Sequence, residues 1–112
     1  MTTDEFREIA LSFPETIESS HMDHPDFRVG GKIFATTTPD GERGMAKLKP
    51  DQQEWFVRTE PAVFEPASGA WGRSGATMIL LVEADESTVR QALNAAWRNT
   101  APKKVVEAHD PQ

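Results

Sequence analysis

Two adjacent glycines constrain the fold of this chain more than any other feature. Gly30-Gly31 separates two short runs of strand-forming residues, 27–29 and 32–35. Type I′ and II′ hairpin turns need positive φ angles, which glycine adopts without steric strain. The pattern therefore predicts an antiparallel β-hairpin. Arg28 and Lys32 flank the turn, so we expect two cations at or near the hairpin tip.

An amphipathic helix is predicted over residues 3–13. Apolar side chains recur there at intervals of three and four residues and so form one stripe along the helix. They are Phe6, Ile9, Ala10 and Phe13. Thr2 or Thr3 can cap its start, and Pro14 is expected to end it.

Strand-forming runs joined by tight turns occupy the middle of the chain. Residues 39–42 (Pro-Asp-Gly-Glu) have the composition of a β-turn. In residues 45–49 lysines alternate with apolar residues, which is typical of a sheet with one solvated face. The predicted strands are 16–22, 27–29, 32–38 and 44–48, with the apolar run 77–82 as the central buried strand.

A helix and a loop are predicted between these strands. The helix begins at Pro50, Asp51 and Glu54 imitate a capping box, and Trp55 and Phe56 are expected on its buried face. The stretch that follows is rich in Pro, Gly and Ala, so we expect an irregular loop. It spans residues 59–75.

The last part of the chain predicts a long helix. It begins at Asp85 or Ser87, carries an apolar stripe that ends at Trp97, and is broken at Ala101-Pro102. A further helical turn can follow from Lys103. Residues 107–112 are expected to be a frayed tail.

The order of elements predicts an α+β fold. Successive strands with tight turns favour a compact two-layer sandwich, in which an antiparallel sheet packs against N- and C-terminal helices. At 112 residues the chain is expected to form one domain, 1–112. The sequence has no cysteine, which excludes disulfides, a thiolate nucleophile and cysteine-ligated metals.

The sequence favours a cytoplasmic protein. No apolar run approaches the roughly 20 residues of a membrane-spanning helix, and the acidic start lacks the pattern of a secretory signal. The net charge of −6 is unevenly distributed, with seven acidic residues against one arginine in 1–26 and five basic residues against two acidic ones in 27–49. An acidic balance argues against an extensive phosphate-binding surface, but it leaves room for a local basic patch.

Four motifs, in their order and spacing, resemble the MmcQ/YjbR family of small bacterial proteins, which are commonly labelled predicted DNA-binding proteins. They are the opening helix ending in Phe13-Pro14-Glu15, the stretch His24–Ala35, the segment Trp71–Gly75, and Trp97 followed by Ala101-Pro102-Lys103-Lys104. Ala76 departs from the pattern, because many family members carry an aromatic residue there. The resemblance implies a compact α/β fold comparable with the frataxin proteins (CyaY-like), and it implies DNA as a partner.

Nucleic acid binding is the first functional hypothesis. The basic hairpin and a lysine-bearing strand could form a winged surface that contacts phosphates. The candidate residues are Arg28, Lys32, Lys47 and Lys49, extended by Arg73, Lys103 and Lys104. Trp71 lies in the predicted loop, where it can stack on a base or fold under the loop as a plug, and we favour the plug. Ordinary solvation of a sheet also produces such alternating charge.

A metal site is the second hypothesis. Residues 21–26 include His21 and His24 among carboxylates, and these side chains bind divalent metals. An extended backbone would send the two imidazoles to opposite faces, so a turn would be required. A frataxin-like site would instead use Asp4, Glu5, Glu8, Glu15 and Glu18. Both patterns are typical of solvated surface, and we predict no bound metal and no cofactor.

Catalysis is the third possibility, and no motif supports it. The sequence has no nucleophile elbow, no phosphate-binding glycine loop and no zinc-protease motif. We therefore predict that the protein is not an enzyme. The alternative to nucleic-acid binding is a protein-interaction module, which would need an exposed apolar patch around Trp71, Phe64 and Ala76.

Overall fold

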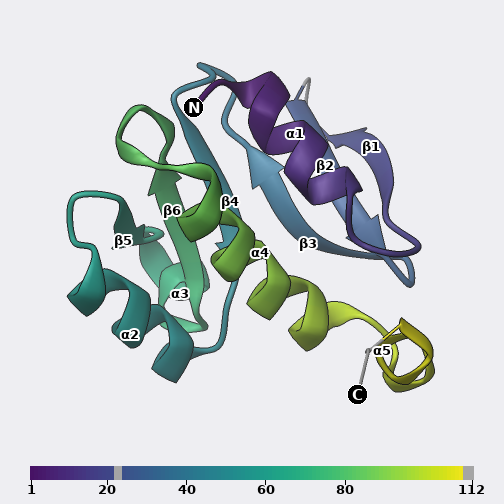
Figure 1. Cartoon of the computed structure of the whole chain (residues 1–112). Coiled ribbons are helices and arrows are strands. Elements are labelled where there is room, and N and C mark those ends of the chain that lie inside the picture. Colours follow the sequence, from purple (N-terminus) through teal and green to yellow (C-terminus); the bar gives the residue numbers. More distant parts are fainter. Residues whose placement is uncertain (22–23, 110–112) are drawn as a thin grey trace.

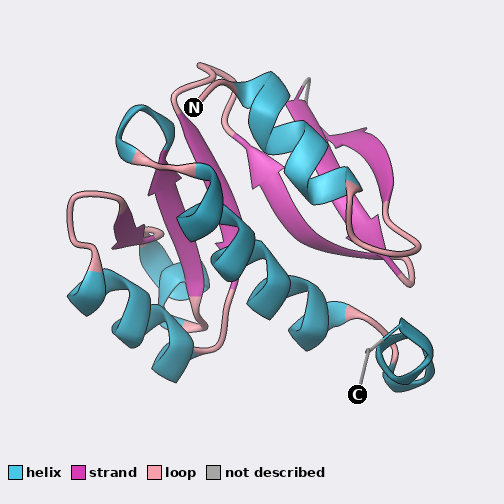
Figure 2. Cartoon of the chain, in the orientation of Figure 1, coloured by secondary structure: helices cyan, strands magenta, loops and turns pink. Residues whose placement is uncertain are grey.

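The chain folds as an antiparallel sheet with a layer of helices on one face (Figures 1 and 2). This computed structural model describes residues 1–21 and 24–109. The six strands lie in the order β1-β2-β3-β4-β6-β5. They are β1 (Ile17–His21), β2 (His24–Val29), β3 (Lys32–Thr37), β4 (Arg43–Lys47), β5 (Phe64–Pro66) and β6 (Ala76–Leu80). The helices are α1 (Thr3–Leu11), α2 (Pro50–Thr59), α3 (Gly69–Arg73), α4 (Glu86–Thr100) and α5 (Lys103–His109), with a 3₁₀ turn at Leu81–Glu83.

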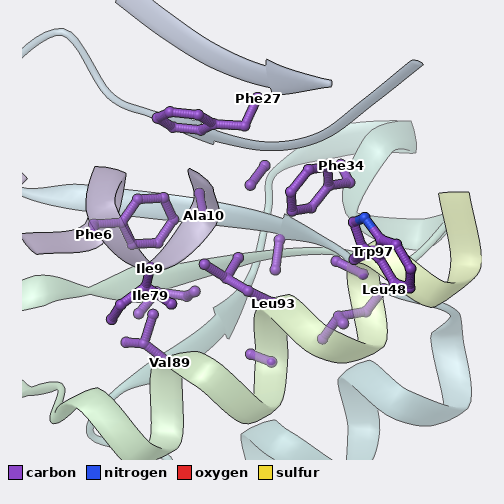
Figure 3. Close-up of a cluster of buried hydrophobic side chains, with 14 of the residues drawn as sticks. Phe6, Ile9, Ala10, Phe27, Phe34, Leu48, Ile79, Val89, Leu93 and Trp97 are labelled. Atoms are coloured by element: carbon purple, nitrogen blue, oxygen red, sulfur yellow. The ribbon is translucent and has the colours of Figure 1, made fainter. Parts of the chain in front are cut away.

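The hydrophobic core lies between the sheet and helices α1, α2 and α4, on the face that we call the inner face (Figures 1 and 3). Phe27 and Phe34 project from the sheet into this core, and each is fully buried. Trp97 of α4 closes one end, where its indole Nε1 donates to the carbonyl oxygen of Pro14 at 3.0 Å. The predicted α+β two-layer sandwich is confirmed.

Side-chain caps fix the starts of the two helices that the sequence predicts best. Thr2 and Glu5 form a reciprocal capping box, with N···O distances of 3.1 and 2.8 Å. Asp85 accepts a hydrogen bond from the backbone N–H of Thr88 at 2.8 Å at the start of α4. This bond holds the pKa of Asp85 below its ordinary value. Helix α1 ends at Leu11, two residues before the predicted Phe13, because Ser12 serves as its C-cap.

A β-bulge between β2 and β3 decides which residues face which side of the sheet. Phe27 pairs with Ala35 and Arg28 pairs with Ile33, so Phe34 is the extra residue. Both Phe34 and Ala35 belong to the core. Ile33 therefore lies on the opposite face of the sheet, which we call the outer face.

The segment predicted as an irregular loop contains two regular elements. Residues 59–75 include strand β5, which pairs with β6, and the five-residue helix α3. This pairing also corrects the predicted strand 77–82. Strand β6 lies second from the edge and is therefore not central. It ends at Leu80, and Val82 in the following 3₁₀ turn is 76% exposed.

Two predictions for α2 were wrong. The backbone N–H of Lys49 donates to the side chain of Gln52 at 2.9 Å, so Asp51 and Glu54 are not the capping pair. Trp55 is 48% exposed, although it was predicted to face the core. Neighbouring helical residues point about 100° apart, so Phe56 packs on the core while Trp55 does not.

Helix α5 extends into the segment that was predicted as a tail. Residues 107–109 belong to α5 and do not fray, and His109 contacts the Glu15 carboxylate at 2.9 Å. The rest of the predicted tail, 110–112, lies outside the described residues. Within the described residues, no helix is long and apolar enough to cross a membrane.

Candidate functional site

The outer face of the sheet carries a pocket of about 410 Å³. Met45 and Met78 form its floor on adjacent strands, where they pair directly across β4 and β6. Met45 is only 1% exposed, yet it does not belong to the inner core cluster. The pocket is therefore a second buried region, on the face opposite the core.

Polar side chains continue this floor across the sheet. Thr36 of β3 pairs with Met45, and Asp26 of β2 pairs with Thr36. Residues paired across antiparallel strands project to the same side, so the row from Met78 to Asp26 faces outward as one surface. The pocket thus joins thioether, hydroxyl and carboxylate groups from four strands.

Asp26 is fully buried and forms an ion pair with Arg28. The Arg28 Nε lies 2.8 Å from Oδ1 of Asp26, and Nη2 lies 3.1 Å from Oδ2. The two residues are two apart on one strand, so both side chains lie on the outer face. The bidentate hydrogen bonds to the carboxylate raise the pKa of Arg28, whose side chain is 30% exposed. Arg28 is therefore the counterion of the buried Asp26 carboxylate.

Helix α3 places Trp71 at the pocket wall. Gly72 allows the close approach of the helix to the preceding segment, since a Cβ there would lie 1.6 Å from the carbonyl oxygen of Ala67. Gln53 of α2 holds the end of the helix by donating to the carbonyl oxygens of Gly72 and Ala76, each at 2.9 Å. Trp71 remains 55% exposed, so the predicted plug under the loop was wrong.

The connection between β3 and β4 forms another wall of the pocket, through Thr38 and Pro39. The Thr38 hydroxyl donates to Oδ1 of Asp40 at 2.6 Å, and the Glu42 N–H donates to the same oxygen at 2.9 Å. These bonds lower the pKa of Asp40, with Thr38 as the larger cause. The turn predicted at 39–42 is confirmed, and its hydrogen bonds fix the pocket wall.

The predicted basic residues divide into two groups, and the first lies on the outer face. Lys47 follows Met45 by two residues on β4, so its exposed side chain lies on the same face as Met45 and Arg28. Strand β3 separates the strands of the two cations, which places these strands roughly 10 Å apart. Arg73 ends helix α3, which borders this face, but it follows Trp71 by two residues and so lies on a different side of the helix.

The second group lies at the end of the hairpin. A Cβ on Gly30 would lie 2.6 Å from the Pro102 side chain, so the hairpin turn packs against the start of α5. Lys32 follows this turn, and Lys103 and Lys104 follow Pro102. Lys49 belongs to neither group, because it caps α2 beyond the end of β4.

Candidate metal ligands do not gather. Within residues 1–21 and 24–109, no three His, Asp or Glu side chains are placed to hold a metal ion. The backbone of His21 pairs with that of His24 across β1 and β2, but the side chain of His21 lies outside what the structure describes. Glu18 forms an ion pair with Arg7 at 2.6 Å, and Glu5 serves the capping box.

The exposed apolar patch expected for a protein-interaction module is not formed. Phe64 is 1% exposed and Ala76 is 3% exposed, because both lie in the paired strands β5 and β6. Of the three residues predicted for the patch, only Trp71 is exposed. The sequence did not reveal the pocket. A signal was present in Met45, an apolar residue on the same strand face as Lys47, which was predicted to be solvated.

Comparison with known proteins assigns the family. The model of the YjbR family matches residues 11–99, which is most of the chain. This chain belongs to the YjbR family. The matched residues include every pocket residue named above, and also Arg28, Lys47 and Arg73. The match ends before Lys103 and Lys104.

A solved structure has the same fold as this YjbR chain. It is the crystal structure of Deinococcus radiodurans protein DR2400, with family-model domain DUF419. The TM-score is 0.74 at 18% sequence identity, and the alignment covers 96% of this chain and 86% of that chain. No curated protein matches the sequence.

Proposed function

We propose that this protein is a non-enzymatic cytoplasmic protein that binds nucleic acid weakly through the outer face of its sheet. The observation that supports the proposal most is the position of Arg28 and Lys47. Both lie on the face that α1, α2 and α4 leave uncovered, on either side of β3. An exposed tryptophan, Trp71, borders the same face.

Phosphate contacts would supply the binding energy. Lysine and arginine side chains bind phosphate oxygens and fix the register of the nucleic acid without reading its sequence. Lys47 and Arg73 form no ion pair with any described carboxylate, so both are available. Few cations and a net charge of −6 together imply weak and strongly salt-dependent binding.

Arg28 can take part although it is paired with Asp26. Its guanidinium has five N–H donors, and the carboxylate accepts from two of its nitrogens. The pair turns Arg28 away from the hairpin tip and onto the outer face. The sequence predicts a contact surface that includes the hairpin, the strand of residues 45–49 and the lysines after Pro102. We therefore narrow the proposed contact surface to the outer face of the sheet.

Fluorescence anisotropy with labelled single-stranded and duplex oligonucleotides, measured across a salt series, tests the proposal. We expect log Kd to rise with log salt concentration, by roughly 0.7–0.9 per phosphate contact. Replacing both Lys47 and Arg73 by alanine should weaken binding and flatten this dependence, because two phosphate contacts are lost.

The matched control removes the same charge from the hairpin end. Lys103→Ala with Lys104→Ala lowers the net charge by two, as the outer-face pair does, but it leaves the sheet unchanged. We expect a much smaller loss of affinity from this control. Equal losses from the two double variants, or no binding by the wild type at low salt, would contradict the proposal.

A further inference from the structure

We propose that the outer-face pocket holds one unstacked base of a single-stranded nucleic acid. This inference rests on the proposed function and names the part of the ligand that the pocket receives. It concerns the floor formed by Met45 and Met78 and the wall formed by Trp71.

The floor and the wall suit a flat ring. Methionine thioethers are polarizable and flexible, so they pack closely against the face of an aromatic ring. An indole side chain offers a π-face on which any base can stack. Met78 is half-buried and Trp71 is 55% exposed. A bound base would cover both side chains, and the loss of their apolar contact with water favours binding.

The edges of the pocket suit the edges of a base. Thr36 brings a hydroxyl group that can donate or accept a hydrogen bond, and the Thr38 hydroxyl, which donates to Asp40, can accept one. The Asp26 carboxylate is fully buried and both of its oxygens accept from Arg28, so the hydroxyl groups are the polar groups that a base can reach. A purely apolar ligand would leave the Thr36 hydroxyl without water, which is unfavourable.

The size and position of the pocket favour a single base of a single-stranded nucleic acid. At about 410 Å³ it lies near the lower end of the usual range for ligand pockets, so it suits one ring system. Arg28 follows the lining residue Asp26 by two positions on β2, and Lys47 follows the lining residue Met45 by two positions on β4. From there both cations can bind the phosphates of the strand whose base enters the pocket. In a duplex the bases are stacked inside, and a base would have to flip out at a free-energy cost before it could enter.

The experiment compares two oligonucleotides with the same phosphates. One is a short labelled oligothymidylate, and the other has the same length but carries abasic sites in place of its bases. We expect the wild type to bind the abasic strand at least about fivefold more weakly than oligothymidylate, because a stacked base contributes to affinity. Trp71→Ala should remove this preference, lowering affinity for oligothymidylate and leaving affinity for the abasic strand unchanged.

Trp55→Ala is the matched control. Trp55 is 48% exposed and Trp71 is 55% exposed, but Trp55 lies on α2 and does not line the pocket. We expect this control to keep the preference for oligothymidylate over the abasic strand. Thermal unfolding of both variants confirms that each is folded.

The outcomes separate this inference from the proposed function. Equal affinity for the two oligonucleotides, with a normal salt dependence, would overturn the base pocket and leave phosphate binding intact. Loss of the preference in Trp55→Ala as well as in Trp71→Ala would also overturn it. No binding of either strand at low salt would contradict both proposals.

Discussion

The two faces of the sheet are buried by different means and carry different chemistry. The inner face is covered by helices and holds aromatic and aliphatic side chains such as Phe27 and Phe34. Helix α3 and the connection between β3 and β4 border the outer face, and its buried residues Met45, Thr36 and Asp26 are mixed in polarity. This difference in chemistry is the basis of the proposal that the outer face binds a ligand.

The largest expected difference between the faces comes from two neighbouring residues of β3. Phe34→Ala removes a fully buried ring from the inner core and should lower the free energy of unfolding by roughly 3–5 kcal/mol. Ile33→Ala removes a half-buried side chain from the outer face and should lower it by about 1 kcal/mol. Urea denaturation of both variants measures the two values. Similar losses would mean that the outer face is as tightly packed as the core.

The second comparison separates the two members of the buried ion pair. Arg28→Ala leaves the fully buried carboxylate of Asp26 without its counterion, which strongly disfavours the folded state. Asp26→Ala leaves Arg28, whose side chain is 30% exposed and can reach water. We therefore expect thermal unfolding at neutral pH to show a lower Tm for Arg28→Ala than for Asp26→Ala. The reverse order would mean that the carboxylate is already solvated.

A third change tests how α3 is held over the outer face. Gly72→Ala would place a Cβ 1.6 Å from the carbonyl oxygen of Ala67, so the backbone must move. We expect a loss of roughly 1–3 kcal/mol in the free energy of unfolding and a change in Trp71 fluorescence. Ser74→Ala, at the end of the same helix, removes only an exposed hydrogen bond to the carbonyl oxygen of Ala70 and should change neither quantity appreciably.

The smallest expected effect concerns the inner layer and depends on pH. The hydrogen bond from the Thr88 N–H lowers the pKa of Asp85 in the folded state, so the ionised form stabilises the fold. This stabilisation is fully present above the unfolded pKa and is lost as pH falls through the lower, folded pKa. Asp85→Asn removes this titration, so its Tm should decline less below about pH 4 than that of the wild type. Parallel pH profiles would show that the cap does not depend on charge.

The inner layer was predictable because its signals are local. The stripe of α1, the cap at Asp85 and the turn at Gly30-Gly31 each lie within a few residues of sequence. Each of these signals gave the correct element. The end of α1 was predicted less accurately, because the cap at Ser12 decides it. The start of α2 was predicted correctly at Pro50, but its capping pair was not.

The outer face could not be predicted because its contacts are distant in the sequence. The bulge at Phe34 changes which residues of β3 face outward, and alternation alone cannot reveal it. Helix α3 has only five residues and depends on Gln53 and on the space left by Gly72. The division of the candidate cations between the sheet and the hairpin end follows from packing at Pro102, which the sequence does not reveal.

Methyl NMR of methionine-labelled protein tests most directly whether nucleic acid binds at the outer face. Met45 and Met78 line the pocket, whereas Met1 lies beside α1 and serves as an internal control. On titration with a single-stranded oligonucleotide at low salt, the Met45 and Met78 methyl resonances should shift to saturation while that of Met1 stays in place. Saturable binding by anisotropy without any shift of Met45 and Met78 would contradict the account.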